Sequence, residues 1–160
     1  MSEIAKPPIA LHATAVPGRA GARLLPEPFA SRLSRRVKHA LGDAFGLRAF
    51  GVNLTRIPAG DVSALHHRHS VQDEWVYVLE GRPTLVTDAG EVELAPGMCA
   101  GFPAGGTAHH LENRTAQDVV VLEVGDRAAG DRVTYPGEDL ALDFGPDGRP
   151  RITHRDGTPY

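Results

Sequence analysis

The chain has 160 residues, of which 41% are hydrophobic and 23% charged, and its formal net charge is −3. This length and composition are typical of one globular domain with its own hydrophobic core, and they exclude a miniprotein that depends on disulfides. The slightly acidic balance disfavours a nucleic-acid partner, and no apolar run approaches the ~20 residues of a membrane-spanning helix.

Cysteine usage and the N-terminal residues indicate a cellular compartment. Cys99 is the only cysteine, which excludes an intrachain disulfide and favours a reducing compartment. Its place in a β-prone run predicts a buried, small apolar side chain, with a reactive thiol as the alternative. The first eight residues lack the apolar core of a signal peptide. We therefore expect a cytoplasmic protein with no membrane partner.

Residues 1–30 predict an extended N-terminal arm, and residues 31–46 predict a short helix and a linker. The arm is rich in proline, which disfavours helix interiors and central strands. Apolar residues then recur every four positions as far as Gly42, which predicts one short amphipathic helix. These apolar residues are Phe29, Leu33, Val37 and Leu41. Basic residues are expected to form the solvated face of this helix: Arg32, Arg35, Arg36 and Lys38.

Residues 47–125 consist of short β-prone runs that alternate with turns rich in glycine, proline and aspartate. Evenly spaced short strands of this kind predict an antiparallel sandwich or barrel. The expected strands are 50–54, 75–79, 84–87, 91–94, 98–102, 109–112 and 119–124.

The last segment, residues 126–160, is more polar and predicts a C-terminal extension. Its apolar run Val133–Tyr135 predicts an added edge strand, whereas 145–148 and 157–159 predict loops. We expect this extension to pack on the barrel or on a dimer partner.

Four side chains with metal-binding atoms stand out in the strand-rich segment. His67 and His69 are two residues apart, so on one strand they point to the same face, and Glu74 begins the next expected strand. His109 lies on an expected strand far along the chain. Three imidazole nitrogens and one carboxylate oxygen suit a divalent transition metal better than calcium or magnesium, which prefer oxygen ligands.

The spacing of these residues resembles the two signature motifs of the cupin superfamily. The resemblance covers about residues 47–125 and extends to a bacterial group of small single-domain cupins without an established function. It implies an all-β fold: an antiparallel double-stranded β-helix, or jelly-roll barrel, with a metal at its mouth and often a dimeric assembly. The first motif is Gly60…His67-Arg-His69…Glu74…Gly81, and the second is Gly97…Pro103-Ala-Gly105…His109…Asn113.

The glycines of the motifs and two shifts in spacing bear on the ligand set. Gly81, Gly97 and Gly105 are expected in tight turns that need a residue without a β-carbon. One extra residue follows Gly60, and the pairing His67/His69 is favoured because the alternative register would make an arginine a ligand. One extra residue also precedes His109, which leaves His110 as an alternative fourth ligand if a β-bulge shifts the strand.

Other roles remain open for several residues near the expected site. Glu74 is either a ligand or a carboxylate that orients a histidine. Phe102 is expected to line the pocket beneath the metal. His66 and His110 are expected to point outward, with a role for either of them at the pocket rim, as a general acid or base, as the alternative. No further catalytic acid or base is evident.

Two classes of function fit this ligand set. The first is an enzyme that uses zinc, iron, manganese or nickel as an isomerase, epimerase, lyase or dioxygenase. The second is a non-catalytic barrel in which the metal is structural or orients a bound ligand. In both cases we expect a small polar metabolite, sugar-like or carboxylate, at the barrel mouth. We also expect a homodimer, because a single small jelly roll exposes edge strands and one sheet face.

Overall fold

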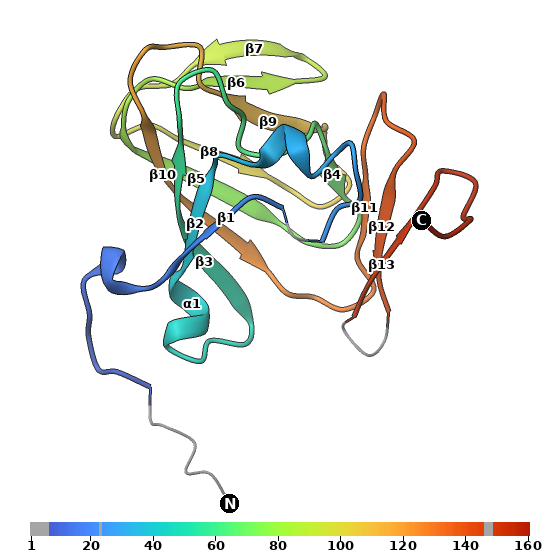
Figure 1. Ribbon diagram of the computed structural model, residues 1–160, viewed down its shortest axis with the longest axis horizontal. Coiled ribbons are helices and arrows are strands. Elements are labelled where there is room, and N and C mark those ends of the chain that lie inside the picture. The colour runs from blue at the N-terminus through green and yellow to red at the C-terminus, as the bar shows by residue number, and fades with distance from the viewer. Residues whose placement is uncertain (1–6, 23, 146–148) are drawn as a thin grey trace, which may run out of the picture.

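The computed structural model describes residues 7–22, 24–145 and 149–160 (Figure 1). Residues 1–6 and 23 of the expected arm, and 146–148 of the expected loop at 145–148, lie outside the described residues. The chain is mostly β, as the strand pattern predicts. Helical structure in the described residues is limited to η1 (Ala13–Ala15), η2 (Ser31–Leu33) and α1 (Leu41–Ala44).

The largest sheet contains six antiparallel strands from both halves of the chain. Its central strand β10 pairs along its whole length with β3 and most of its length with β5. In spatial order the strands are β1 (Gly18–Ala20), β2 (Val37–Ala40), β3 (Phe50–Ile57), β10 (Val119–Asp126), β5 (Glu74–Glu80) and β8 (Cys99–Phe102).

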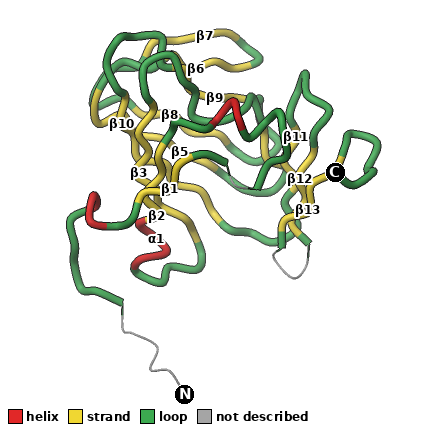
Figure 2. Tube along the Cα trace, in the orientation of Figure 1, coloured by secondary structure: helices red, strands yellow, loops and turns green. Residues whose placement is uncertain are grey.

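Two smaller antiparallel sheets complete the fold (Figure 2). One has the order β13 (Pro150–Thr153), β12 (Ala141–Phe144), β11 (Arg132–Thr134) and β4 (Arg68–His69). The other has the order β7 (Gly90–Glu93), β6 (Thr84–Thr87) and β9 (His109–Glu112). Strand pairing among the described residues therefore forms three antiparallel sheets, so the expected all-β antiparallel fold is confirmed and closure into a jelly-roll barrel is not.

Two hydrophobic cores hold these sheets together. The first lies between the six-stranded sheet and the β6–β9 pair, because alternate residues of each strand point inward. Its buried members are Ile57, Val76, Val78, Leu85, Leu94, Leu111, Val119 and Val121. Burial of each such side chain contributes roughly 1.5–3 kcal/mol to folding.

The second core joins the N-terminal and C-terminal segments to the strand that carries the candidate ligands. Phe29 and Leu33 precede β2, Leu65 precedes β4, and Val133 and Tyr135 come from the C-terminal extension. Leu140 and Leu142 also belong to it. Residues from the N-terminal and C-terminal segments thus form one wall beside His69 of β4 and His67, which precedes that strand.

The helix expected from the four-residue period is only partly confirmed. One short α-helix is present, but it starts at Leu41, where the periodicity predicted the end. The preceding residues form the 3₁₀ turn η2 and then strand β2, which pairs with both β1 and β3. Phe29 and Leu33 are buried as expected, but the backbone pairs of β2 replace the helical hydrogen bonds.

The basic residues of this segment divide into two pairs, contrary to the single solvated face expected. Arg32 and Arg35 make ion pairs at the surface with Glu138 and Asp61. Arg36 and Lys38 instead line a cavity. Arg36 and Lys38 point into the same cavity because residues two positions apart in an extended segment share one face.

Most strands of the central segment are confirmed. Strands β6 and β9 have the expected bounds, and β3, β5, β7, β8 and β10 overlap the expected runs. The Val133–Tyr135 run forms most of β11, which lies between β12 and β4 and is therefore an internal strand. Gly81, Gly97 and Gly105 have φ values of 79°, 91° and 69°, which confirms the expected turns.

One prediction about side-chain burial is wrong. Cys99 is exposed, because it points away from the core on β8, the outermost strand of the six-stranded sheet.

No helix among the described residues has the length and apolar character needed to cross a membrane.

Candidate metal centre

The four candidate ligands lie on three neighbouring strand segments. His67 and His109 are direct partners in an antiparallel bridge, and each backbone N–H donates to the other's carbonyl oxygen at 3.2 and 2.8 Å. His69 lies two residues along in β4, and Glu74 is the first residue of β5. Backbone pairing thus brings the distant second motif against the first.

Three imidazoles converge on one oxygen of Glu74. The distances from Glu74 Oε2 are 3.1 Å to His109 Nε2, 3.3 Å to His67 Nε2 and 3.4 Å to His69 Nε2. Ligand atoms of His67, His69 and Glu74 also lie within 4.8 Å of one another. His110 does not take part, because β9 pairs with β6 in regular register and the His110 side chain lies on the other side of the strand from His109.

The outer nitrogen of each imidazole faces a hydrogen-bond acceptor. His67 Nδ1 lies 2.8 Å from the Leu65 carbonyl oxygen, and His69 Nδ1 lies 2.6 Å from Asp131 Oδ2. His109 Nδ1 lies 3.5 Å from the Thr107 carbonyl oxygen. Acceptors at Nδ1 favour the tautomer with the proton on Nδ1, which leaves the Nε2 lone pair free toward the centre.

Asp131 is the most deeply embedded part of this arrangement. The residue is 1% exposed, and its Oδ1 accepts hydrogen bonds from the backbone N–H groups of Ser70, Val71 and Gln72 at 3.0, 2.9 and 3.4 Å. Burial raises the pKa of this carboxyl, but the hydrogen bonds from Val71 and His69 outweigh that effect and lower it below its usual value. Asp131 therefore stays ionised and fixes the loop after His69.

The electrostatics of Glu74 also keep a negative charge at the centre. Burial alone would raise its pKa. Hydrogen bonds from His109 and His67, together with the charges of His67 and His69, lower the pKa well below its usual range. Glu74 therefore stays ionised, and a bound cation would replace the protons that the imidazoles share with it. Once those protons are lost, the carboxylate and the three Nε2 lone pairs form a donor set that suits a divalent transition metal.

Aromatic rings support two of the histidines. The Phe102 ring stacks on His109 with 3.4 Å between centroids and an interplanar angle of 4°. The Tyr135 ring stacks on His67 with a centroid distance of 6.1 Å and an angle of 29°. Phe102 and His110 both line a small cavity next to Glu74. The stacking of Phe102 on His109 and of Tyr135 on His67 restricts the rotation of these two imidazoles.

His66 and His110 form a separate, partly buried hydrogen-bonded pair. Their Nδ1 atoms lie 3.0 Å apart, and the two Nε2 atoms face Asp88 and Glu112 at 2.8 and 3.0 Å. Burial lowers the pKa of His110, and Glu112 offsets this only in part. Both ring nitrogens of His110 are therefore engaged, which leaves neither of them free for a substrate in this arrangement.

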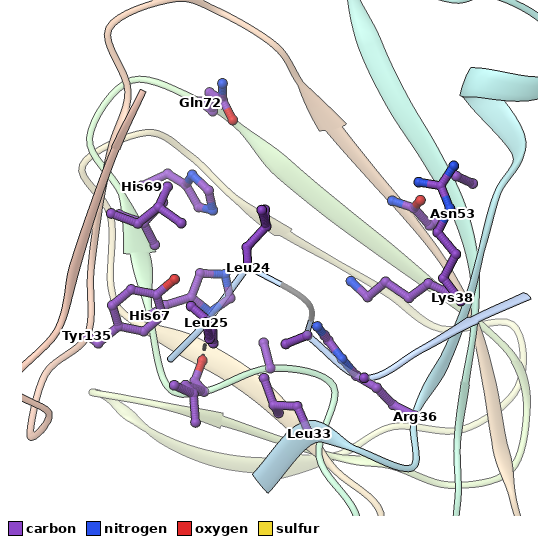
Figure 3. A pocket seen from close by; sticks show the side chains of 18 of the residues that line it. Leu24, Leu25, Leu33, Arg36, Lys38, Asn53, His67, His69, Gln72 and Tyr135 are labelled. Atoms are coloured by element: carbon purple, nitrogen blue, oxygen red, sulfur yellow. Dashed lines mark hydrogen bonds between the residues drawn. The ribbon is translucent and has the colours of Figure 1, made fainter. Parts of the chain in front are cut away.

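A larger cavity of about 620 Å³ opens beside His67 and His69 (Figure 3). Its volume lies within the range of small-molecule binding sites, ~300–1,000 Å³. Figure 3 shows His67, His69 and Tyr135 on one side and Arg36, Lys38 and Asn53 on the other. Leu24, Leu25 and Leu33 form part of the wall between them.

Sequence reasoning located the four candidate ligands but missed three residues around them. Asp131 and Tyr135 lie in the C-terminal extension, where no motif or spacing marks them. Arg36 lines the cavity instead of the predicted solvated surface, and its alternation with Lys38 is the pattern of residues on one strand face.

Comparisons with known proteins identify the family of this chain. Residues 53–125 match the family model described as the Cupin domain. A crystal structure of a sugar phosphate isomerase from a cupin superfamily, from Silicibacter pomeroyi, has 38% sequence identity and a TM-score of 0.88, with 94% of this chain and 96% of that chain covered. None of the curated proteins compared with the chain matches it.

Two further solved structures are similar over most of the fold. A protein from Acidithiobacillus ferrooxidans, provisionally described as a sugar phosphate isomerase, has 34% identity and a TM-score of 0.71, with 79% of this chain and 80% of that chain covered. The polyketide cyclase RemF from Streptomyces resistomycificus has 24% identity and a TM-score of 0.59, with 73% and 78% covered, and indicates the fold alone.

Proposed function

Because this chain belongs to the cupin superfamily, we propose that it is a divalent-metal-dependent enzyme that isomerises a small sugar phosphate. The observation that carries the proposal is the convergence of three imidazole Nε2 atoms on Glu74 Oε2 beside a cavity of about 620 Å³. The names of two solved structures with 38% and 34% sequence identity support the substrate class. The fold alone does not identify the substrate class, because cupins that share one architecture catalyse different reactions.

His67, His69, Glu74 and His109 would hold one ion of zinc, iron, manganese or nickel. When bound, such an ion polarises a carbonyl or hydroxyl oxygen of the substrate. The protein side chains then have to orient the sugar, exclude water and move protons. Asp131 contributes indirectly, because its contact with His69 holds that imidazole in the tautomer that a ligand needs.

Tyr135 is the proposed proton donor to a substrate oxygen. Its ring lines the large cavity and stacks on His67. Burial raises the pKa of Tyr135 to about 12, so the phenol stays protonated at neutral pH and can donate a hydrogen bond. An aldose–ketose isomerisation moves hydrogen between adjacent carbons, and a donor at the carbonyl oxygen favours that step.

Turnover tests the proposal directly. Metal-loaded protein incubated with aldose and ketose phosphates should interconvert them, as followed by NMR. Tyr135→Phe should lower kcat by roughly 10²-fold or more with little change in metal content. Tyr77→Phe is the matched control, because Tyr77 stacks on Trp75, away from the large cavity.

Two results would count against this function. One is the lack of interconversion of any aldose or ketose phosphate by metal-loaded protein, which would favour the non-catalytic binding module. The other is a Tyr135→Phe variant with the kcat of the unmodified protein, which would remove Tyr135 from the mechanism.

We also infer that the protein forms a homodimer. Large apolar side chains remain exposed on β3 and β5: Phe50 is 42%, Trp75 40% and Leu79 38% exposed. Exposed large apolar residues on one sheet favour association. Light scattering should give about twice the chain mass of 17.1 kDa, and Trp75→Glu should shift it toward one chain. A monomer at micromolar concentration without substitution would contradict the inference.

A further inference from the structure

The side of the large cavity that faces His67 carries a concentration of positive charge. Arg36, Lys38 and Ala40 all line the cavity at every second position, as residues on one strand face do. Arg19 on β1 is the direct pairing partner of Lys38 and lines the cavity as well. Like charges opposite each other on neighbouring strands repel and destabilise the sheet. Such an arrangement calls for a compensating negative charge.

The cavity itself supplies little of that compensation. No aspartate or glutamate occurs among the described residues that line it. Lys38 makes an ion pair with Glu123 at 2.6 Å, and Glu123 Oε2 also accepts a hydrogen bond from the Thr55 hydroxyl at 2.8 Å. Arg19 contacts Asp43 at 3.9 Å on the exposed side. Two of the three cations therefore have a carboxylate nearby.

Arg36 differs from the other two cations. Among the described residues, its guanidinium makes one hydrogen bond, from Nη1 to the Ser63 carbonyl oxygen, and its Nε is buried without a partner. Burial also lowers the pKa of Arg36, which Glu123 offsets only in part. A guanidinium in a low-dielectric environment gains strongly from a bidentate anion. Figure 3 shows its head and that of Lys38 directed into the cavity.

We propose that Arg36, with Lys38 beside it, binds the phosphate group of the substrate, while the sugar end faces His67 and His69 across the cavity. This inference rests on the proposed function, since it assigns the two ends of the same substrate. The assignment explains why one cavity has candidate metal ligands on one side and, on the other, basic residues without any aspartate or glutamate in the described lining. The phosphate would satisfy the free donors of Arg36 and reduce repulsion between β1 and β2.

Binding without turnover tests the assignment. Sorbitol phosphate and sorbitol, which cannot undergo aldose–ketose isomerisation, are titrated calorimetrically into the metal-loaded protein, with inorganic phosphate as a third probe. Sorbitol phosphate should bind at least 10-fold more tightly than sorbitol. Arg36→Met should weaken sorbitol phosphate by roughly 10- to 100-fold and leave sorbitol and the metal content unchanged.

Arg35→Met is the matched control, because it removes the same charge from the neighbouring residue, which pairs with Asp61 and does not line the cavity. It should bind sorbitol phosphate like the unmodified protein. Arg36→Lys should restore part of the affinity, since it returns the charge without the guanidinium fork. If Arg36→Met does not fold, the affinities for sorbitol phosphate and sorbitol are compared in Lys38→Met instead. An unchanged preference of Lys38→Met for sorbitol phosphate over sorbitol would overturn the assignment.

The outcomes separate this inference from the proposed function. Loss of phosphate affinity in Arg36→Met supports the phosphate site even if the protein turns over no sugar phosphate. Isomerase activity with equal KM in Arg36→Met and the unmodified protein overturns the phosphate site and leaves the activity standing. Tighter binding of gluconate than of sorbitol phosphate would also overturn it, because the anion would then be a carboxylate.

Discussion

Replacing His67 and His69 together with alanine should abolish metal binding and all metal-dependent activity. The pair supplies two of the three Nε2 atoms around Glu74 Oε2, at 3.3 and 3.4 Å. Glu74 and His109 alone would leave a two-ligand site, whereas transition metals in proteins are usually held by three or more side chains. Elemental analysis should find about one ion per chain in the unmodified protein and almost none in the double variant.

The neighbouring histidines provide a control of equal size. His66→Ala with His110→Ala also removes two imidazoles, but these face each other, Asp88 and Glu112. This variant should keep its metal. The ligand assignment would fail if the His67/His69 variant retained a full complement of metal, or if the His66/His110 variant lost it.

Asp131→Asn should weaken metal binding by roughly 10- to 100-fold, although it leaves all four candidate ligands in place. The carboxylate oxygen 2.6 Å from His69 Nδ1 can only accept a hydrogen bond. An asparagine NH₂ at that place would donate to Nδ1 instead. His69 would then carry its proton on Nε2, where the metal has to bind.

The same substitution should also destabilise the fold, by roughly 1–3 kcal/mol. Oδ1 of Asp131 accepts from three consecutive backbone N–H groups after His69, and a neutral amide oxygen is a weaker acceptor for them. Metal titration and urea unfolding of the metal-free protein measure the two effects separately.

Asp139→Asn is the matched control for this prediction. Asp139 also contacts a histidine, His154 Nδ1 at 2.9 Å, but that pair lies at the exposed C-terminal end. The control should change neither metal affinity nor stability appreciably, since exposed ion pairs contribute little. An Asp131→Asn variant with unchanged metal affinity would show that the tautomer of His69 does not depend on Asp131.

The central strands and the candidate ligands were predictable because their signals are local. Alternating side chains predicted the bounds of β6 and β9 correctly, and spacing within each motif selected His67, His69, Glu74 and His109. Strands β5, β9 and β10 bury alternate residues on one face, so the period of two is strong there.

The residues that complete the site depend on long-range packing. Asp131 reaches His69 from 62 residues along the chain, and neither its neighbours nor its spacing marks it. Arg36 was misassigned because Phe29, Leu33, Val37 and Leu41 recur at a helical period that the backbone does not follow. Pairing of β2 with β3 and β1 determines the strand conformation, and such partners are not visible within the segment itself.

The central claim is that His67, His69, Glu74 and His109 surround one transition-metal ion. Anomalous diffraction from crystals of protein purified without a metal-affinity column, with data on both sides of the zinc, iron, manganese and nickel edges, tests it most directly. We predict one anomalous peak between the three Nε2 atoms and Glu74, within about 2.0–2.3 Å of its ligand atoms. An ordered site without any anomalous peak, after soaking with each of these metals, would contradict the account.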